Sequence, residues 1–266
     1  MNSGRKWGIG WMTDHPDETG VEFTEVKPSK RKFTLIEFTV TVSIIAMIVA
    51  ILSPILRSRD RGGHGHSRTH CINNLKNISL ALHNYNNTYG GLPPAYTVDA
   101  DGKPLHSWRT LILPYLDYRP LYESIDLTKP WDDPANAEAY AMQLSVFQCP
   151  SAALDPQQTV YLAVTAQGGF FGEDVPRKFT DVTDDPHETL MVIEAPFKNA
   201  VHWMAPRDAD ERVVLSLANE AELHHPGASV AAFVDGTVRA ISDTISKSEF
   251  RRMISIAGDE NRAASP

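Results

Sequence analysis

His225 and Asp235 are the residues of this chain whose types could perform catalysis. A histidine that is oriented by a carboxylate supplies the general base of many hydrolase sites. The sequence contains neither a Gly-x-Ser-x-Gly nucleophile motif nor a His-Glu-x-x-His metal motif. Asp235 and Gly236 are also the residue pair that a tight hairpin turn requires. We therefore interpret this box as structural, expect no enzyme, and expect His225 to hydrogen-bond the backbone. A hydrolase is the alternative.

Four carboxylates lie close together in one predicted loop. They are Asp181, Asp184, Asp185 and Glu188. Hard oxygen ligands of this kind could hold Ca²⁺, although their spacing is not that of an EF-hand loop. The alternative is a solvated acidic loop, and apart from this Ca²⁺ we expect no cofactor. Trp131 and Trp203 could form a sugar-binding face, or they could lie in the core or at an interface.

The elements that position these groups begin with a long apolar segment. Residues 38–56 form a run of nineteen amino acids without a charge. As a helix this run would be about 28 Å long, close to the roughly 30 Å hydrocarbon core of a bilayer. We predict a transmembrane helix. It could be a plain single-span anchor with basic flanks, or it could have a further role in assembly. Glu37 stands at its edge, where a carboxylate is usually kept for a partner.

The segment Phe33-Thr34-Leu35-Ile36-Glu37 follows the basic residues Lys30-Arg31-Lys32. It resembles the N-terminal processing and assembly segment of type IV pilins and pseudopilins. In that family a prepilin peptidase cuts before the Phe, and the Glu at the fifth mature position pairs with the N-terminus of the neighbouring subunit. The resemblance gives these roles to Phe33 and Glu37. Lys32 stands where the family has Gly.

Several later segments carry a second resemblance. They include Cys71-Ile-Asn-Asn-Leu-Lys, Trp108-Arg109, Phe147-Gln-Cys149-Pro150-Ser151, and a box of His225, nine residues, Asp235 and Gly236. In this order, over residues 33–257, the chain is similar to a large bacterial family that is abundant in planctomycetes. Its members join a pilin-type N-terminal helix to an ectodomain of unknown function.

Charge and cysteine content limit the partners and the redox state. From Cys71 onward the chain has 15 Lys and Arg against 26 Asp and Glu, so this part would repel nucleic acid. Cys71 and Cys149 are the two cysteines of the chain. Because the predicted span would place both outside the reducing cytosol, we predict a disulfide between them. The alternative is two separate buried thiols.

A helix is predicted from residue 69 to residue 89, because apolar side chains recur there at spacings of three and four. Gly90 should end this helix. Three glycines between residues 62 and 65 predict a break before it, so we expect residues 57–70 to form a linker.

Runs of β-branched and apolar residues predict strands at residues 145–149, 160–165 and 190–194. Residues 229–241 predict a hairpin about an Asp-Gly turn of the primed type. Ser107 and Ser246 should cap short helices. The expected fold class is α+β and pilin-like, in which a long N-terminal transmembrane and amphipathic helix precedes an antiparallel sheet with short helices.

These patterns predict a non-enzymatic, membrane-anchored, pilin-like protein that takes part in an extracytoplasmic assembly or secretion-related complex. We expect a single pass through the inner membrane, with the N-terminus cytoplasmic and the C-terminal domain periplasmic or extracellular. The expected partners are the membrane and other pilin-like subunits. The alternative is a monomeric anchored module that binds a carbohydrate or Ca²⁺. The expected divisions are a polar leader (1–32), a transmembrane helix (33–56), a linker (57–70), an α+β domain (71–258) and a tail (259–266).

Overall fold

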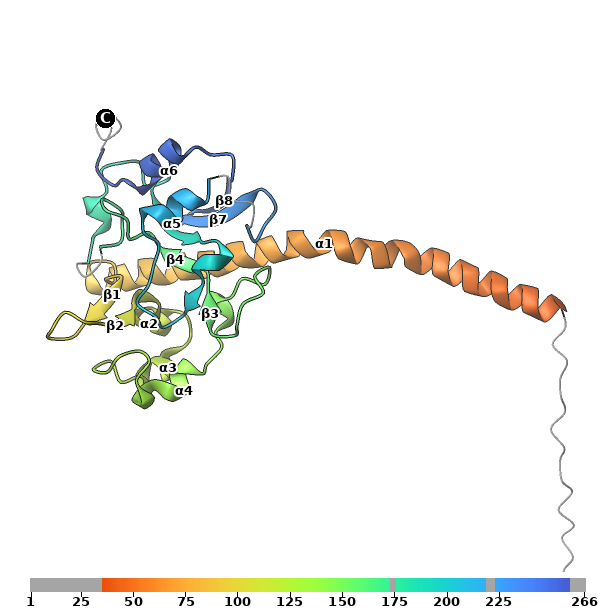
Figure 1. Ribbon diagram of the computed structural model, residues 1–266, viewed down its shortest axis with the longest axis horizontal. Coiled ribbons are helices and arrows are strands. Elements are labelled where there is room, and N and C mark those ends of the chain that lie inside the picture. Colours follow the sequence, from red (N-terminus) through yellow and green to blue (C-terminus); the bar gives the residue numbers. More distant parts are fainter. Residues whose placement is uncertain (1–34, 173–175, 219–222, 259–266) are drawn as a thin grey trace, which may run out of the picture. The chain divides into compact units, whose positions relative to one another are not determined.

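The computed structural model describes residues 35–172, 176–218 and 223–258 (Figure 1). In the long first helix, the side chains of residues 35, 37 and 50–66 are not described. The leader, the tail, Lys32 and Phe33 therefore lie outside the described residues, as does the side chain of Glu37. The chain divides into two compact units, residues 1–53 and residues 54–266, and each is treated by itself.

Helix α1 runs from Leu35 to Tyr89. In the first unit its described apolar side chains are exposed, from Ile36 at 75% to Val49 at 60%. The hydroxyls of Thr39 and Ser43 donate to the carbonyls of Ile36 and Thr39, so both of these donors are paired within the helix. Within the described part of the chain, no helix combines the length and the apolar character that crossing a membrane requires. The side chains of residues 50–56, part of the predicted span, are outside that description.

Helical backbone continues through residues 57–70, where we expected a linker. A glycine costs a helix only about 1 kcal/mol relative to alanine, and this preference is readily outweighed by packing elsewhere in the same helix. The packing that follows is extensive, because Cys71, Leu75, Ile78 and Leu82 are all completely buried. The spacing of apolar residues thus identified the docked part of the helix correctly.

Gly90 ends α1 as predicted. Its φ of 75° lies in the left-handed region that favours glycine. Its N–H donates to the carbonyl of Asn86 at 2.7 Å, which satisfies one of the free carbonyls of the last turn.

The main sheet has four antiparallel strands in the order β4-β5-β7-β8. They are β4 (Tyr161–Ala163), β5 (Leu190–Glu194), β7 (Ala228–Phe233) and β8 (Val238–Ser242). The second half of α1 covers one face, where Leu75 and Ile78 share a core with Val192 and Val230. This arrangement confirms the α+β class, and β5 has the predicted bounds.

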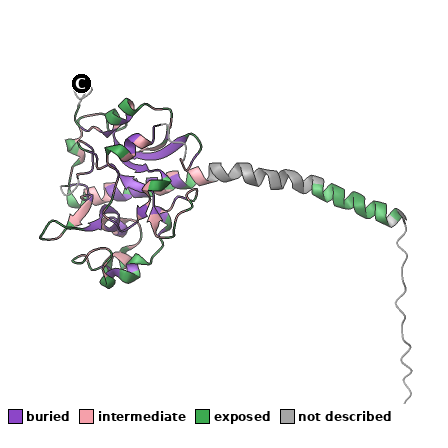
Figure 2. Ribbon diagram, in the orientation of Figure 1, coloured by how far each residue is buried: buried purple, intermediate pink, exposed green. Residues whose placement is uncertain are grey.

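The other face of the sheet is covered by two short helices, α5 (Glu211–Ser216) and α6 (Lys247–Ile254). Val214 of α5 and Phe250 of α6 pack there with strand residues such as Ile193 and Phe233. Because both faces are covered, every residue of β5 and β7 is buried (Figure 2). Ser246 caps α6 by accepting from Glu249 N, as its sequence predicts.

Smaller elements complete the domain. Two further antiparallel pairs are β1 (Tyr96–Val98) with β2 (Pro104–Ser107), and β3 (Gln158–Thr159) with β6 (Val201–His202). The remaining α-helices are α2 (Trp108–Leu111), α3 (Arg119–Ser124) and α4 (Ala137–Tyr140). Ser107 caps α2 by accepting from Arg109 N, as predicted.

The strand expected at residues 145–149 is wrong. The chain forms a 3₁₀ turn there, η3 (Ser145–Phe147), instead. A β-branched run becomes a strand only where a neighbouring strand can pair with it. Here the carbonyls of Ser145 and Gln148 accept from the Asn74 amide of α1, so a helix side chain takes the place of a strand partner.

The β7–β8 hairpin forms as predicted, but its turn is not of the primed type. Such a turn needs positive φ at both central residues, whereas only Gly236 has it, at 88°. Phe233 accepts from Gly236 N and donates to Thr237 O, which is a type I turn followed by a glycine bulge. A Cβ on Gly236 would lie 3.3 Å from His83 Nε2 of α1. The turn therefore packs closely against the helix.

Gly236→Ala is predicted to destabilise the protein more than Gly102→Ala. Both glycines have positive φ, at 88° and 79°, so each alanine pays a similar backbone strain of about 1–2 kcal/mol. Space is open around Gly102, whereas His83 beside Gly236 is held by stacking on Phe179 at 4.5 Å. Urea unfolding of the two variants measures the difference. Equal losses would contradict the close contact between turn and helix.

Candidate functional site

Four ionisable residues meet in the core on the α1 side of the sheet. They are Cys71, Cys149, Glu194 and His225, with exposed fractions of 2% or less. Their ligand-type atoms all lie within 4.8 Å of one another, and no other such group of three or more occurs among the described residues. We call this the Cys–Glu–His cluster. Ionisable side chains are rarely buried without a partner, so this concentration is a candidate site.

Each member is positioned by a different element. Cys71 lies on the buried stripe of α1, and Glu194 ends β5 opposite Tyr161 of β4. Cys149 follows η3, and the Asn74 amide of α1 donates to the carbonyls at both ends of this turn, those of Ser145 and Gln148. His225 precedes β7, and its carbonyl accepts from Ala228 N at 3.2 Å.

The structure brings the two cysteines together. Cys71 Sγ and Cys149 Sγ are 2.7 Å apart, and both residues are free thiols. Both are buried thiols, as in the alternative, but they are adjacent and not separate. The disulfide between them stays a prediction.

Glu194 and His225 approach each other without completing a hydrogen bond. Glu194 Oε2 lies 3.3 Å from His225 Nε2, an ion-pair distance. Among the described residues, Glu194 Oε1, His225 Nε2 and Tyr161 OH are buried without a hydrogen-bond partner. An unsatisfied buried polar atom costs about 1–3 kcal/mol, so the cluster as it stands is missing an interaction.

Charges in the cluster shift one another's pKa. The hydrogen bond with Cys149, together with one from His225, outweighs burial and lowers the pKa of Cys71 to about 6. Burial opposes a charge on His225, yet contacts with Cys71 and Glu194 raise its pKa to about 9. Burial would likewise raise the pKa of Glu194, but His225 brings it below its usual value. The pKa of Cys149 is raised by its hydrogen bond with Cys71 and by burial. The favoured forms are thus a thiolate, an imidazolium and a carboxylate beside one thiol.

His225 and Asp235, the pair considered for catalysis, have different partners. Asp235 Oδ2 lies 2.7 Å from His187 Nδ1, and Asp235 Oδ1 accepts from Thr237 N within the hairpin turn. The turn role expected for Asp235 and Gly236 is therefore confirmed. The expectation that the His225 side chain binds backbone is wrong, because its ring faces Glu194 and, at 3.5 Å, Ser151 Oγ.

The four acidic residues expected to offer a Ca²⁺ site each serve local structure. Asp181, Asp184 and Asp185 accept from the backbone N–H groups of residues 178, 258 and 187. Glu188 pairs with Arg239 at 3.0 Å. In the described part of the chain these carboxylates do not gather into a metal-ligating group.

The tryptophans do not form a shared sugar-binding face. Trp203 is 1% exposed and donates through Nε1 to the carbonyl of Met142, so it is a core residue. Trp131 is partly exposed and packs against Tyr140 and His202.

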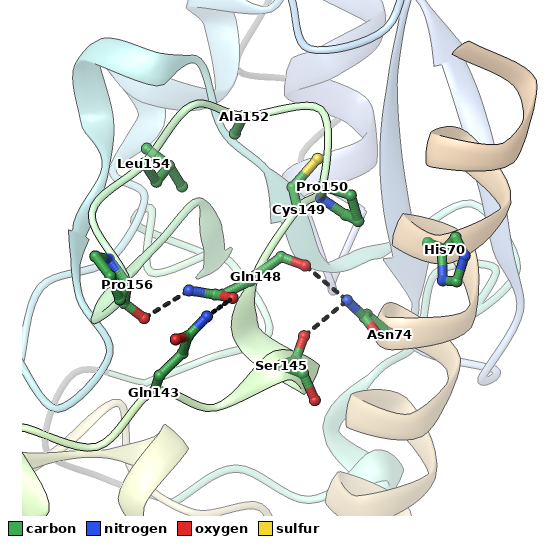
Figure 3. A pocket seen from close by; sticks show the side chains of 10 residues that line it. All are labelled: His70, Asn74, Gln143, Ser145, Gln148, Cys149, Pro150, Ala152, Leu154 and Pro156. Carbon is green, nitrogen blue, oxygen red and sulfur yellow. Dashed lines mark hydrogen bonds between the residues drawn. The ribbon is translucent and has the colours of Figure 1, made fainter. Parts of the chain in front are cut away.

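A pocket of about 430 Å³ lies beside the cluster (Figure 3). Its wall includes His70 and Asn74 of α1 on one side and the segment from Gln148 to Pro156 on the other. Cys149 is part of this wall, so the pocket borders one residue of the cluster.

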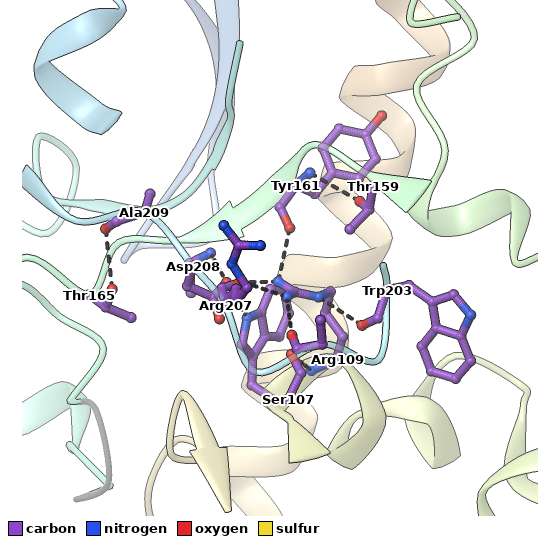
Figure 4. Close-up of polar contacts among 12 residues, drawn as sticks. Ser107, Arg109, Thr159, Tyr161, Thr165, Trp203, Arg207, Asp208 and Ala209 are labelled. Atoms are coloured by element: carbon purple, nitrogen blue, oxygen red, sulfur yellow. Dashed lines mark hydrogen bonds and ion pairs between the residues drawn. The ribbon is translucent and has the colours of Figure 1, made fainter. Parts of the chain in front are cut away.

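A second buried charge, Arg109, has a structural role (Figure 4). Arg109 is unexposed and makes five hydrogen bonds, one of them to Asp208 at 2.7 Å. The other four go to the backbone carbonyls of Tyr161, Trp203, Ala205 and Arg207. Its guanidinium therefore has no donor left for a ligand.

Asp208→Asn is predicted to destabilise the protein by about 3 kcal/mol or more, because it leaves the Arg109 charge buried without its counter-ion. The matched control is Glu211→Gln, which removes a carboxylate from an exposed pair with Arg251 and should cost less than about 1 kcal/mol. Chemical denaturation of both variants gives the comparison. Similar small losses would show that the Arg109–Asp208 pair does not support the core.

Residues 68–164 match the family model described as "Protein of unknown function (DUF1559)". No curated protein and no solved structure matches the chain. The matched stretch contains Cys71 and Cys149, whereas Glu194, His225 and the helix start lie outside it. Over residues 68–164 the chain is thus similar to a family of unknown function, which fits the family resemblance of its sequence.

Proposed function

We propose that this protein is a non-enzymatic, pilin-like subunit that is anchored through the first part of α1 and displays its α+β domain in an extracytoplasmic assembly. The observation that carries the proposal is the apolar surface of the helix over residues 36–49. Exposed apolar side chains follow one another there. They are Ile36, Phe38, Val40, Val42, Ile44, Ile45, Met47, Ile48 and Val49, each between 48% and 75% exposed.

These positions do not form one stripe. Successive residues of a helix are about 100° apart, so the nine side chains spread over about two-thirds of the circumference. On the remaining third, the hydroxyls of Thr39 and Ser43 donate to carbonyls of the same helix. A helix that is apolar over most of its circumference is stable when lipid or other helices surround it. One contact face of a soluble partner would leave the opposite side in water. Insertion into a membrane among neighbouring subunits covers all sides.

The architecture of the second unit supports the same proposal. A helix end that packs on one face of an antiparallel sheet, with apolar residues on the earlier part of the same helix, is the arrangement expected for a pilin-like subunit. The segment from Phe33 to Glu37 has the corresponding processing and assembly residues. Partners would be copies of this chain or other pilin-like subunits, with the N-terminus on the cytoplasmic side of the inner membrane.

Glu37→Ala is predicted to weaken contacts between subunits. In such an assembly the carboxylate would pair with a neighbour's N-terminal amine, and losing about 1.4 kcal/mol lowers an association constant tenfold. A photoreactive amino acid at Ile45 of the full chain should crosslink subunits in membranes, and Glu37→Ala should reduce this about tenfold. Glu123→Ala, an exposed change on α3, is the matched control. Absent crosslinks, or crosslinks that Glu37→Ala leaves unchanged, would contradict the proposal.

Lys32→Gly is predicted to increase cleavage before Phe33, because it restores the small residue that the prepilin peptidase accepts in the resembling family. Mass spectrometry of the N-terminus of membrane-purified protein measures the cleaved fraction. Lys30→Gly is the control, since it removes a similar charge two residues earlier. If Lys32→Gly leaves the cleaved fraction unchanged, the prediction that a prepilin peptidase processes this chain is wrong.

A further inference from the structure

We propose that Cys71, Cys149, Glu194 and His225 together bind one Zn²⁺ ion, which fastens α1 to the sheet. This inference concerns the second unit and does not depend on how the helix is anchored. It assigns to the Cys–Glu–His cluster a metal held by two thiolates, in place of the disulfide that the sequence predicts.

The donor set selects the metal. Two sulfurs, one imidazole nitrogen and one carboxylate oxygen give four ligands, the number that structural zinc sites use. Thiolates are poor ligands for Ca²⁺ and Mg²⁺, which prefer oxygen. Since all four positions come from the protein, none is left for water or substrate. The site is therefore structural rather than catalytic.

The geometry is close to what a zinc ion needs. With zinc bonds of about 2.0–2.3 Å, tetrahedral ligand atoms lie about 3.3–3.8 Å apart. Glu194 Oε2 and His225 Nε2 are already 3.3 Å apart, and all four ligand atoms fall within 4.8 Å of one another. The two sulfurs, at 2.7 Å, must separate by about 1 Å to reach the tetrahedral spacing.

Burial distinguishes a metal from a disulfide as the partner of these residues. His225 Nε2 has no hydrogen-bond partner among the described residues, and the side chains of His225 and Glu194 are at least nine-tenths buried. A disulfide would use the two sulfurs and leave this nitrogen unsatisfied. A zinc ion would bond the imidazole and the carboxylate together with both sulfurs, and the Cys149 thiol and the His225 imidazolium would each release a proton to solvent. Its two positive charges would offset most of the negative charge of two thiolates and a carboxylate.

The surroundings have the features of a supported zinc site. Ser151 Oγ lies 3.5 Å from His225 Nδ1, the ring nitrogen that a metal on Nε2 leaves free. Such contacts orient the imidazole of zinc ligands. Val230 N lies 3.4 Å from Glu194 Oε2 and restrains the carboxylate.

The experiment uses the full chain, purified in detergent under reducing conditions, stripped with a chelator and titrated with Zn²⁺ against a chromophoric competitor. We expect one Zn²⁺ per chain. His225→Gln should weaken the Zn²⁺ affinity by about 100-fold or more, because even the loss of a group that only hydrogen-bonds to a metal ligand weakens the affinity about 10–100-fold. His224→Gln is the matched control, since the neighbouring ring bonds the carbonyl of Ala195 instead. The Zn²⁺ affinity of His224→Gln should stay within about threefold of that of the unmodified chain, because a substitution that removes no ligand has an effect of about this size.

A second measurement keeps the proposal falsifiable if His225→Gln does not fold. Co²⁺ added to the reduced, unmodified chain should give the thiolate charge-transfer and tetrahedral ligand-field absorption bands of a sulfur-ligated site. Three results would overturn the assignment. They are a folded reduced chain that takes up no Zn²⁺, equal affinities in the two histidine variants, and Co²⁺ bound without thiolate bands. A native Cys71–Cys149 disulfide whose reduction creates no Zn²⁺ site would overturn it as well.

Discussion

The carboxylate of Glu194 lies in the middle of the molecule, 1% exposed, at the end of a strand covered on both faces. A charge removed from water costs several kcal/mol unless opposite charge and hydrogen bonds compensate it. Much of the domain can be understood from this constraint. His225 from the loop before β7, Cys71 from α1 and Cys149 from the loop after η3 all converge on the one carboxylate. Three segments far apart in sequence are therefore held at one point of the sheet.

The same constraint is met differently at Asp208. There the counter-charge is Arg109, whose five hydrogen bonds hold β4 to its neighbouring loops. Asp208 and Glu194 each have one oxygen without a hydrogen-bond partner among the described residues. The two sites differ in their neighbours, because Asp208 faces a guanidinium, which offers no lone pair to a metal, whereas Glu194 lies with two sulfurs and an imidazole. This difference makes one buried charge a structural ion pair and the other a candidate metal site.

The spacing of apolar residues along the chain correctly predicted the helix and strand segments whose structure depends on local periodicity. The helix stripe around Leu75 and Ile78 and the apolar run of β5 were visible in the sequence, because burial imposes a period on each. The strand expected at residues 145–149 failed since its hydrogen bonds go to an asparagine on α1. Of the cluster, the sequence indicated the cysteine pair and singled out His225, but it paired this histidine with Asp235 instead of Glu194. Glu194 and His225 join it through the strand order of the sheet, and no spacing along the chain reveals that order.

The zinc K-edge X-ray absorption spectrum of the full chain, loaded with one Zn²⁺, tests the central claim most directly. The cluster predicts two sulfur neighbours at about 2.3 Å and two nitrogen or oxygen neighbours at about 2.0 Å. A spectrum with nitrogen and oxygen neighbours alone would place the zinc elsewhere and contradict the account.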